Sequence, residues 1–209
     1  MNYVFDLLIL VILFTLFGYI HSVLASEKVK IWIRKNFGKR IAFYRIGYNI
    51  FSFINLYFIW DLAPHPSLQI YTLPQPYDYF VLIPQLFSLI GVMWCFKYIN
   101  FKEFLGLSQI DRYLKNEYSD NELDEHYTLQ IEGPYKYSRH PIYFFSIIFL
   151  MFRAEMNLSY LTMFLSFTAY FYIGSYYEEK KMVRLYGDDY RNYQLKIPRI
   201  FPIKVKTGK

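Results

Sequence analysis

The sequence predicts an all-α integral membrane protein with five transmembrane helical segments, of which the last two form a helical hairpin, and a cytoplasmic C-terminal helix. The first observation behind this fold class is the length of the uncharged stretches. Residues 46–60, 79–96 and 156–177 carry no charged side chain, and residues 3–25 carry only Asp6. A soluble domain of 209 residues cannot bury so many long apolar helices, whereas a bilayer can. The second observation is the one-sided placement of the basic residues.

The apolar segments are placed at about 3–25, 42–60, 78–96, 141–152 and 156–177. The first lacks the basic residues that precede the apolar core of a signal peptide, and it is too long for such a core, so we expect a span. The chain is treated as a single membrane domain, residues 1–209, with four parts. These are three N-terminal spans at 1–96, a cytoplasmic loop at 97–140, the hairpin at 141–177 and a cytoplasmic tail at 178–209.

Basic residues predict the orientation. Of the 23 Lys and Arg residues, 22 lie within residues 26–45, 97–139 and 178–209, and the segment at 61–77 has none. Because basic residues concentrate on the cytoplasmic side, the N-terminus is predicted to lie outside and the C-terminus in the cytoplasm. Anionic lipid of the inner leaflet accounts for the net charge of +6, so no nucleic-acid partner is predicted.

The fourth segment is too short to cross a bilayer. Its 12 residues, 141–152, make about 18 Å of helix, and the hydrocarbon layer is about 30 Å thick. A polar run at 153–157 then precedes the fifth segment, so the two segments are expected to form a hairpin. Its feet, residues 139–140 and 178–179, would emerge together on the cytoplasmic side. Residues 111–132, which are rich in acidic side chains, are expected to be a solvated loop there.

Several kinds of site are disfavoured. A single cysteine, Cys95, excludes a disulfide framework and a Cys-rich zinc site. None of the nine glycines lies within three residues of another, so a Rossmann dinucleotide-binding domain and a phosphate loop are not expected. No metal-ligand spacing such as His-Glu-x-x-His occurs, and no metal site is predicted.

The strongest local motif is GPYKYSRHPIY, which starts at Gly133. Gly-Pro predicts a turn, and Pro141 suits the first position of a helix, so Arg139 and His140 would lie at the start of that helix. The unpaired N–H groups there can hold a carboxylate, and His140 can transfer a proton near neutral pH. The alternative is an Arg-His pair that anchors the helix to lipid headgroups.

A second motif is Glu178-Glu179, directly after the fifth apolar segment. Adjacent carboxylates repel each other, and a bound cation would relieve that repulsion. The alternative is that Lys180 and Lys181 neutralise the pair in solvent.

Weaker candidates lie in the tail and in the N-terminal half. Arg191 and Arg199 are candidates for binding an anion, although for each of them alone the favoured alternative is a surface or headgroup contact. His21 and Ser22 lie near the end of the first span, and Tyr48-Asn49 near the start of the second. Polar groups at that depth tend to face a helix-bundle interior or a cavity, or to make helix–helix hydrogen bonds.

The stretch at 133–202 resembles the integral membrane methyltransferases of the isoprenylcysteine carboxyl methyltransferase type, with phospholipid N-methyltransferases as more distant relatives. Arg-His-Pro-x-Tyr, the Glu-Glu pair and Tyr-Gly-x-x-Tyr-x-x-Tyr carry this resemblance. HSVLAS from His21, NFKEFLGLSQ from Asn100 and the Tyr48-Asn49 pair resemble the methanethiol S-methyltransferase and NnrU-like branch.

The resemblance implies S-adenosyl-L-methionine as methyl donor, bound by the hairpin and the tail. The Glu-Glu pair would meet the cationic amino group or the ribose of the donor, and Arg139 or Arg191 would suit its carboxylate. The residues expected to bind the cofactor are Gly133, Pro134, Tyr135, His140, Pro141, Tyr143, Glu178, Glu179 and Arg191.

The resemblance also implies a reaction, the methylation of a small thiol such as methanethiol to a thioether by in-line displacement. The candidate catalytic residues are His140 as base, His21 as the second choice and Arg139 as a positive charge. The acceptor, a small apolar thiol or a lipid-tailed molecule, would enter from the bilayer of a bacterial inner membrane. The alternatives are carboxyl methylation of a prenylated cysteine and a non-catalytic NnrU-like membrane subunit.

Overall fold

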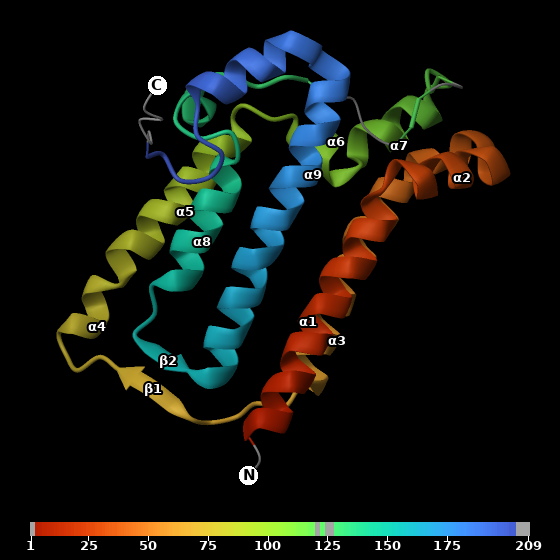
Figure 1. Cartoon of the computed structure of the whole chain (residues 1–209). Coiled ribbons are helices and arrows are strands. Elements are labelled where there is room, and N and C mark those ends of the chain that lie inside the picture. The colour runs from red at the N-terminus through yellow and green to blue at the C-terminus, as the bar shows by residue number, and fades with distance from the viewer. Residues whose placement is uncertain (1–2, 120–121, 124–127, 204–209) are drawn as a thin grey trace. The chain divides into compact units, whose positions relative to one another are not determined.

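The computed structural model describes residues 3–119, 122–123 and 128–203, and these are mostly helical (Figure 1). They divide into two compact units. The first unit comprises residues 3–11, 64–98 and 129–203, and the second comprises residues 12–63 and 99–128. Asp120, Asp124 and Glu125 of the predicted acidic loop lie outside the described residues.

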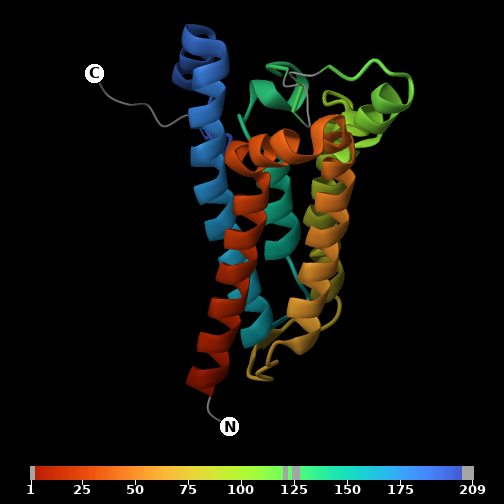
Figure 2. The same ribbon diagram turned by 90° about the vertical axis from the view of Figure 1, so that its right-hand side faces the viewer.

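The second unit contains most of α1 and a set of shorter helices that follow it. Its elements are α1 (Tyr3–Ala25), α2 (Glu27–Phe37), the 3-10 helix η1 (Gly38–Phe43), α3 (Tyr44–Leu62), α6 (Phe101–Leu105) and α7 (Leu107–Leu114). Ser26 separates α1 from α2 and caps α2, because its hydroxyl accepts a hydrogen bond from the N–H of Val29. α2 therefore turns away from the axis of α1 directly after α1 ends (Figure 2).

The second unit contains a small apolar cluster and, beside it in the chain, a cluster of charged side chains. Ile41, Ala42 and Tyr118 form its buried cluster. The guanidinium of Arg112 donates to both carboxylate oxygens of Glu103 at 2.9 Å and also pairs with Glu122. The side chains of both glutamates are largely buried, so this part of the predicted solvated loop is ordered around an arginine.

The first unit contains the hairpin. Its elements are β1 (Gln69–Thr72), α4 (Tyr77–Phe80), α5 (Leu82–Phe96), the 3-10 helix η2 (Gly133–Lys136), α8 (Pro141–Met151), β2 (Glu155–Asn157) and α9 (Leu158–Lys196). α5 and α8 pack side by side (Figure 1). Gly91 of α5 permits this approach, because a Cβ there would lie 2.3 Å from the ring of Phe145.

The turn of the hairpin contains a strand that the sequence analysis did not predict. β2 occupies the polar run after α8 and pairs antiparallel with β1, with Thr72 opposite Glu155 and Tyr71 opposite Met156. β1 lies in the segment expected to be a plain loop. The strand pairing satisfies backbone N–H and C=O groups of both segments. The short polar sequences by themselves give no sign of this pairing.

α9 also extends further than the fifth apolar segment. It continues through the charged residues after position 177 as far as Lys196, with a kink at Gly187, where φ is 55° and ψ is −125°. The predicted tail helix is therefore the continuation of α9. Glu, Lys, Arg and Leu are good helix formers, so the loss of hydrophobicity after the apolar segment does not end the helix.

Two helical stretches in the described part of the chain are long and apolar enough to cross a membrane, Tyr3–Ala25 and Tyr77–Phe96. α8 is a shorter apolar helix of 11 residues. The fold is consistent with an all-α membrane protein, and the five-span topology stays a prediction.

Candidate functional site

The site lies in the first unit, where α8 begins and α9 passes beside it. Pro141 occupies the first position of α8, which leaves Arg139 and His140 just before the helix. Glu178 and Glu179 lie on α9, about forty residues further along the chain, and Glu179 contacts Arg139. The structure thus brings together the two feet of the hairpin.

Glu179 is the centre of the cluster. Its side chain is buried, with only 4% of the residue exposed. Arg139 Nη2 donates to its Oε2 at 3.2 Å, and Arg139 Nε lies 2.8 Å from its Oε1. Gln194 Nε2 donates to Oε2 at 2.9 Å, and Arg199 Nε lies 3.5 Å from the same oxygen. Polar groups of the protein therefore lie close to both oxygens of this carboxylate.

His140 bridges the two carboxylates. Its Nδ1 lies 3.3 Å from Glu178 Oε2, and its Nε2 lies 3.3 Å from Glu179 Oε1. Burial by itself lowers the pKa of His140, but the hydrogen bonds and negative charges of Glu178 and Glu179 outweigh burial and hold the pKa above its usual value. The two carboxylates therefore favour the protonated form of His140.

The pKa of Glu179 is shifted in the opposite direction, below its usual value. Burial raises the pKa of a carboxyl group, but the hydrogen bond from His140, the charge of Arg139 and the hydrogen bond from Gln194 bring the pKa of Glu179 below its usual value. Glu179 is consequently ionised at neutral pH and is paired within the protein.

Glu178 differs from its neighbour. Half of its side chain is exposed, at 50%, and the hydroxyl of Tyr143 donates to its Oε1. The Tyr143 ring stacks between two other rings, His140 at 5.3 Å and Phe171 at 4.8 Å between centroids. This stack fixes the direction of the Tyr143 hydroxyl, and with it one oxygen of an accessible carboxylate.

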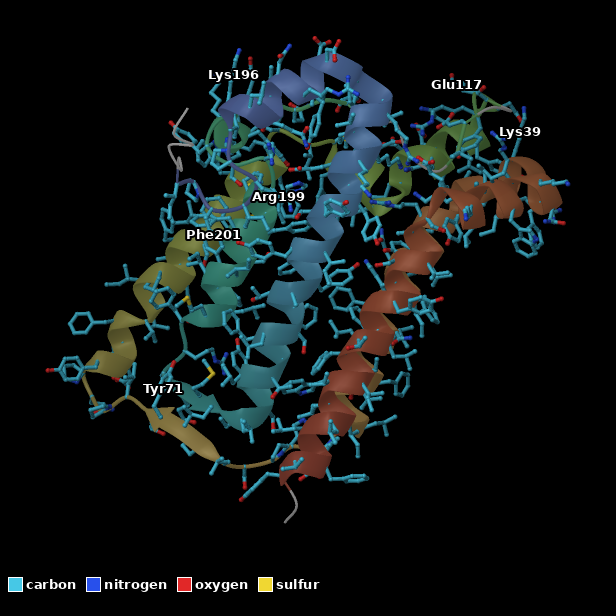
Figure 3. The ribbon with its side chains drawn as sticks, viewed as in Figure 1. Lys39, Tyr71, Glu117, Lys196, Arg199 and Phe201 are labelled. Atoms are coloured by element: carbon cyan, nitrogen blue, oxygen red, sulfur yellow. The ribbon has the colours of Figure 1, made fainter. Side chains whose placement is uncertain are left out.

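The segment after α9 binds the residues just before α8. The N–H of Arg139 donates to the carbonyl of Pro198 at 3.0 Å, and the N–H of His140 donates to the carbonyl of Arg199 at 2.9 Å. The hydroxyl of Ser138 donates to the carbonyl of Ile200 at 2.7 Å. Figure 3 shows Arg199 on this segment next to α8. Two N–H groups expected to hold an anion thus bind carbonyls of the tail.

The Gly-Pro-Tyr turn that starts at Gly133, before Arg139 and His140, makes a close contact with Tyr98. Gly133 has a φ of +57°, and a Cβ at this position would lie 2.3 Å from the ring of Tyr98. Pro134 is buried, and the hydroxyl of Tyr193 donates to the carbonyl of Tyr135. The Gly-Pro-Tyr turn is therefore packed between the end of α5 and the last turns of α9.

Among the arginines, the tertiary structure distinguishes two that the sequence treated alike. Arg191 lies outside the cluster, since it pairs with Asp188 at 2.8 Å and its side chain is 62% exposed. Arg199 contacts Glu179 and is only partly exposed. Gln194 is a site residue that the sequence analysis missed. No sequence signal marks it, because the kink at Gly187 brings it back to Glu179.

His21 lies in the second unit. It contacts Tyr48 and Ser52 of α3, both through hydrogen bonds. Asn49 donates to the carbonyls of Phe104 and Leu105, as expected for a helix–helix contact. In the described residues no group of three or more His, Cys, Asp and Glu side chains has an arrangement that could hold a metal ion.

Comparison with known proteins finds a family match and several similar proteins. Residues 87–189 match the family described as phospholipid methyltransferase. Methanethiol S-methyltransferase 1 of Bradyrhizobium diazoefficiens is 27% identical over 195 residues, which cover 91% of this chain and 65% of the relative. The chain thus spans slightly less than two thirds of that relative's length.

Two further relatives are similar over nearly the whole chain. Methanethiol S-methyltransferase of Crocosphaera subtropica is 27% identical over 94% of this chain and 74% of its own length. Methanethiol S-methyltransferase of Pseudomonas deceptionensis is 28% identical over 94% of this chain and 72% of its own length. No solved structure matches the chain.

Proposed function

Because residues 87–189 match the phospholipid methyltransferase family, we propose that the chain is an integral membrane methyltransferase that transfers a methyl group from S-adenosylmethionine to a small thiol. The observation that carries the proposal is the Arg139, His140, Glu178 and Glu179 cluster, which lies within the matched segment. The names of the relatives favour methanethiol as the acceptor.

The residues present suit the donor. S-adenosylmethionine carries an ammonium group, a carboxylate and a sulfonium cation, and it supplies the electrophilic methyl group of the reaction. Glu178 has an accessible carboxylate for the ammonium group, and Arg199 has a partly exposed guanidinium for the carboxylate. The hydroxyl of Tyr143 holds one oxygen of the Glu178 carboxylate in place.

The two adjacent carboxylates have different roles in this proposal. Glu178 faces the ligand, because half of its side chain is exposed. Glu179 is a positioning residue, because its oxygens are bound by Arg139, Gln194, His140 and Arg199. Gly133, Pro134, Tyr135 and Pro141 would shape the wall of the same pocket.

The charge state of His140 bears on the mechanism. A thiol must lose its proton before it attacks, because the thiolate is the nucleophile. Glu178 and Glu179 raise the pKa of His140 and so favour its protonated form, which can contribute positive charge beside Glu178. In-line transfer then requires that the acceptor sulfur, the methyl carbon and the leaving sulfur be held in line.

For the membrane arrangement we propose the orientation derived from the basic residues. α1, α3, α5 and the α8–α9 hairpin supply the five segments, with the N-terminus outside, and the site faces the cytoplasm of a bacterial inner membrane. The donor then enters from the cytoplasm, and an apolar acceptor enters from the bilayer. Membrane lipid is the other expected partner.

A second candidate function is carboxyl methylation of a prenylated cysteine, which needs no base because the carboxylate is already ionised. The third reading, a non-catalytic subunit, is disfavoured by the buried charge cluster. A scaffold gains little from it, since buried ion pairs are costly to desolvate.

The experiment that tests the proposal uses the full chain purified in detergent. Calorimetric titration with S-adenosylhomocysteine measures donor-site binding, and headspace gas chromatography measures dimethyl sulfide formed from methanethiol. A farnesylated cysteine serves as the competing acceptor. Binding with thioether formation supports the proposal; binding with methyl ester formation favours the prenylcysteine reaction; absence of binding by the folded protein refutes both.

A further inference from the structure

Helix α2 follows α1 after a single residue, Ser26, and both helix ends belong to the second unit. α2 runs across the direction of α1 and does not continue it (Figure 2). The stretch Tyr3–Ala25 is long and apolar enough to cross a membrane. A helix that turns aside where such a span ends lies along the membrane surface, and in the proposed arrangement this is the cytoplasmic surface.

One face of α2 packs into the second unit. Lys30 is 2% exposed, and Ile33 packs against the buried cluster of Ile41, Ala42 and Tyr118. Residues three positions apart share a face of a helix, so Lys30 and Ile33 mark the inner face of α2. This packing fixes the rotation of α2 about its own axis and decides which residues the opposite face presents.

The opposite face, here called the outer face of α2, carries two lysines with two apolar side chains between them. It consists of Lys28, Ile31, Trp32 and Lys35, which have the i, i+3, i+4, i+7 spacing of a single helix face. All four side chains are exposed, Trp32 to 60%. The exposed ring of Phe37 packs edge to face on Trp32 at 6.2 Å. Adjacent exposed apolar side chains flanked by charge mark an interaction surface.

The charge of this region indicates the partner. Residues 26–45 contain seven basic residues and one acidic residue, Glu27. Lysine near a membrane is attracted to anionic headgroups, and its stem can lie along apolar surface while the ammonium group stays in water. An indole ring is favoured at the boundary between headgroups and acyl chains. Anionic phospholipid therefore supplies a suitable contact for both kinds of side chain on the outer face.

We propose that the outer face of α2 lies among the headgroups of the cytoplasmic leaflet, where Lys28 and Lys35 bind phosphates of anionic phospholipids and the Trp32 ring lies at the boundary with the acyl chains. This inference rests on the membrane arrangement of the proposed function, and it names the lipid class and the surface that binds it. Because η1 and then α3 follow α2 directly, the lipid contact sets the depth at which α1 ends and α3 begins.

The test uses the full chain in lipid vesicles, with Trp60→Phe and Trp94→Phe so that Trp32 is the remaining tryptophan. Quenching of its fluorescence by brominated phosphatidylglycerol and by brominated phosphatidylcholine measures which lipid lies beside Trp32, and quenching by iodide measures its access to water. We expect stronger quenching by phosphatidylglycerol and weak quenching by iodide. Lys28→Gln and Lys35→Gln should each lower the preference for phosphatidylglycerol about fivefold, the factor for one lysine near an anionic surface. The controls, Lys115→Gln and Lys196→Gln, remove exposed lysines of α7 and α9 and keep the preference.

Strong quenching by iodide without quenching by brominated lipid would overturn the inference, since the outer face would then lie in water and be open to a protein partner. Equal quenching by the two lipids, unchanged in the lysine variants, would overturn it as well, because apolar contact alone gives no headgroup preference. If the background with two tryptophans replaced fails to fold, the wild type is compared with Trp32→Phe, and the difference in quenching belongs to Trp32. Failure of the chain to float with the vesicles overturns the membrane arrangement and the inference together, whereas absence of methyl transfer affects only the proposed reaction.

Discussion

Replacement of Glu179 by glutamine should separate stability from ligand binding. The side chain of Arg139 is 9% exposed and makes two contacts with the Glu179 carboxylate, at 2.8 and 3.2 Å. Without that charge, the buried guanidinium of Arg139 lacks its counter-ion. Breaking a buried ion pair costs about 3 to 5 kcal/mol, and glutamine retains the volume and one acceptor oxygen, so about 3 kcal/mol is expected.

This loss corresponds to a fall of about 6 to 12 °C in the apparent melting temperature, at about 2 to 4 °C per kcal/mol for a chain of this size. Differential scanning fluorimetry in detergent measures it. Glu178→Gln is the contrasting variant, because half of its side chain is in solvent. It should melt within about 4 °C of the wild type, since an exposed ion pair contributes about 0 to 1 kcal/mol. It should also bind S-adenosylhomocysteine about 10- to 100-fold more weakly, through the loss of a charged hydrogen bond.

Glu117→Gln, at an exposed position in the second unit, is the matched control and should change neither property. The reasoning is refuted if Glu179→Gln melts like the wild type and loses as much affinity as Glu178→Gln. That result would mean that the Glu179 carboxylate faces the ligand and that its protein contacts contribute little.

Three further predictions concern the arginines, the histidine and the kink. Arg191→Ala should leave the affinity for S-adenosylhomocysteine unchanged and should change the stability by less than about 0.5 kcal/mol, because the side chain is exposed. Arg199→Ala should weaken binding of S-adenosylhomocysteine. Equal titration curves for the two variants would contradict this prediction. Because the pKa of His140 is raised, its ion pairs stabilise fully below the unfolded pKa of about 6.5 and are lost as pH rises through the folded value. The melting temperature of the wild type should therefore fall more than that of His140→Gln between pH 6 and pH 9, and parallel curves would argue against a charged His140. Gly187→Ala forces a side chain into positive φ and should cost about 1 kcal/mol or more and lower the rate of methyl transfer; an unchanged melting temperature would show that the kink is relaxed.

The hairpin illustrates how far sequence reasoning reaches. The short apolar run after Pro141 and the longer run before Glu178 predict two antiparallel helices, and the structure has α8 and α9 in these places. The same reasoning predicts that the Arg-His and Glu-Glu pairs meet, because a hairpin brings its feet together. Pairing of this kind follows from chain connectivity and helix length alone.

Other features of the site depend on contacts between distant segments. The sequence treats Glu178 and Glu179 as one motif, and only the packing of α9 makes one accessible and the other buried. A helix turns about 100° per residue, so adjacent side chains point in different directions and their roles depend on what covers each face. Likewise, the sequence offers both Arg191 and Arg199 as anion-binding candidates, and the contact of Arg199 with Glu179 distinguishes them.

The sequence by itself determined that the chain is helical and apolar, and which residue types could bind a donor with both charges. These properties are local: they follow from hydropathy, charge and the spacing of residues that are close in the chain. Only the tertiary structure decided which carboxylate is accessible, that Gln194 joins the site, and that His21 has hydroxyl partners whereas His140 has carboxylates. Burial and charge state depend on groups brought together by folding, and a titratable side chain acquires its chemical role from those neighbours.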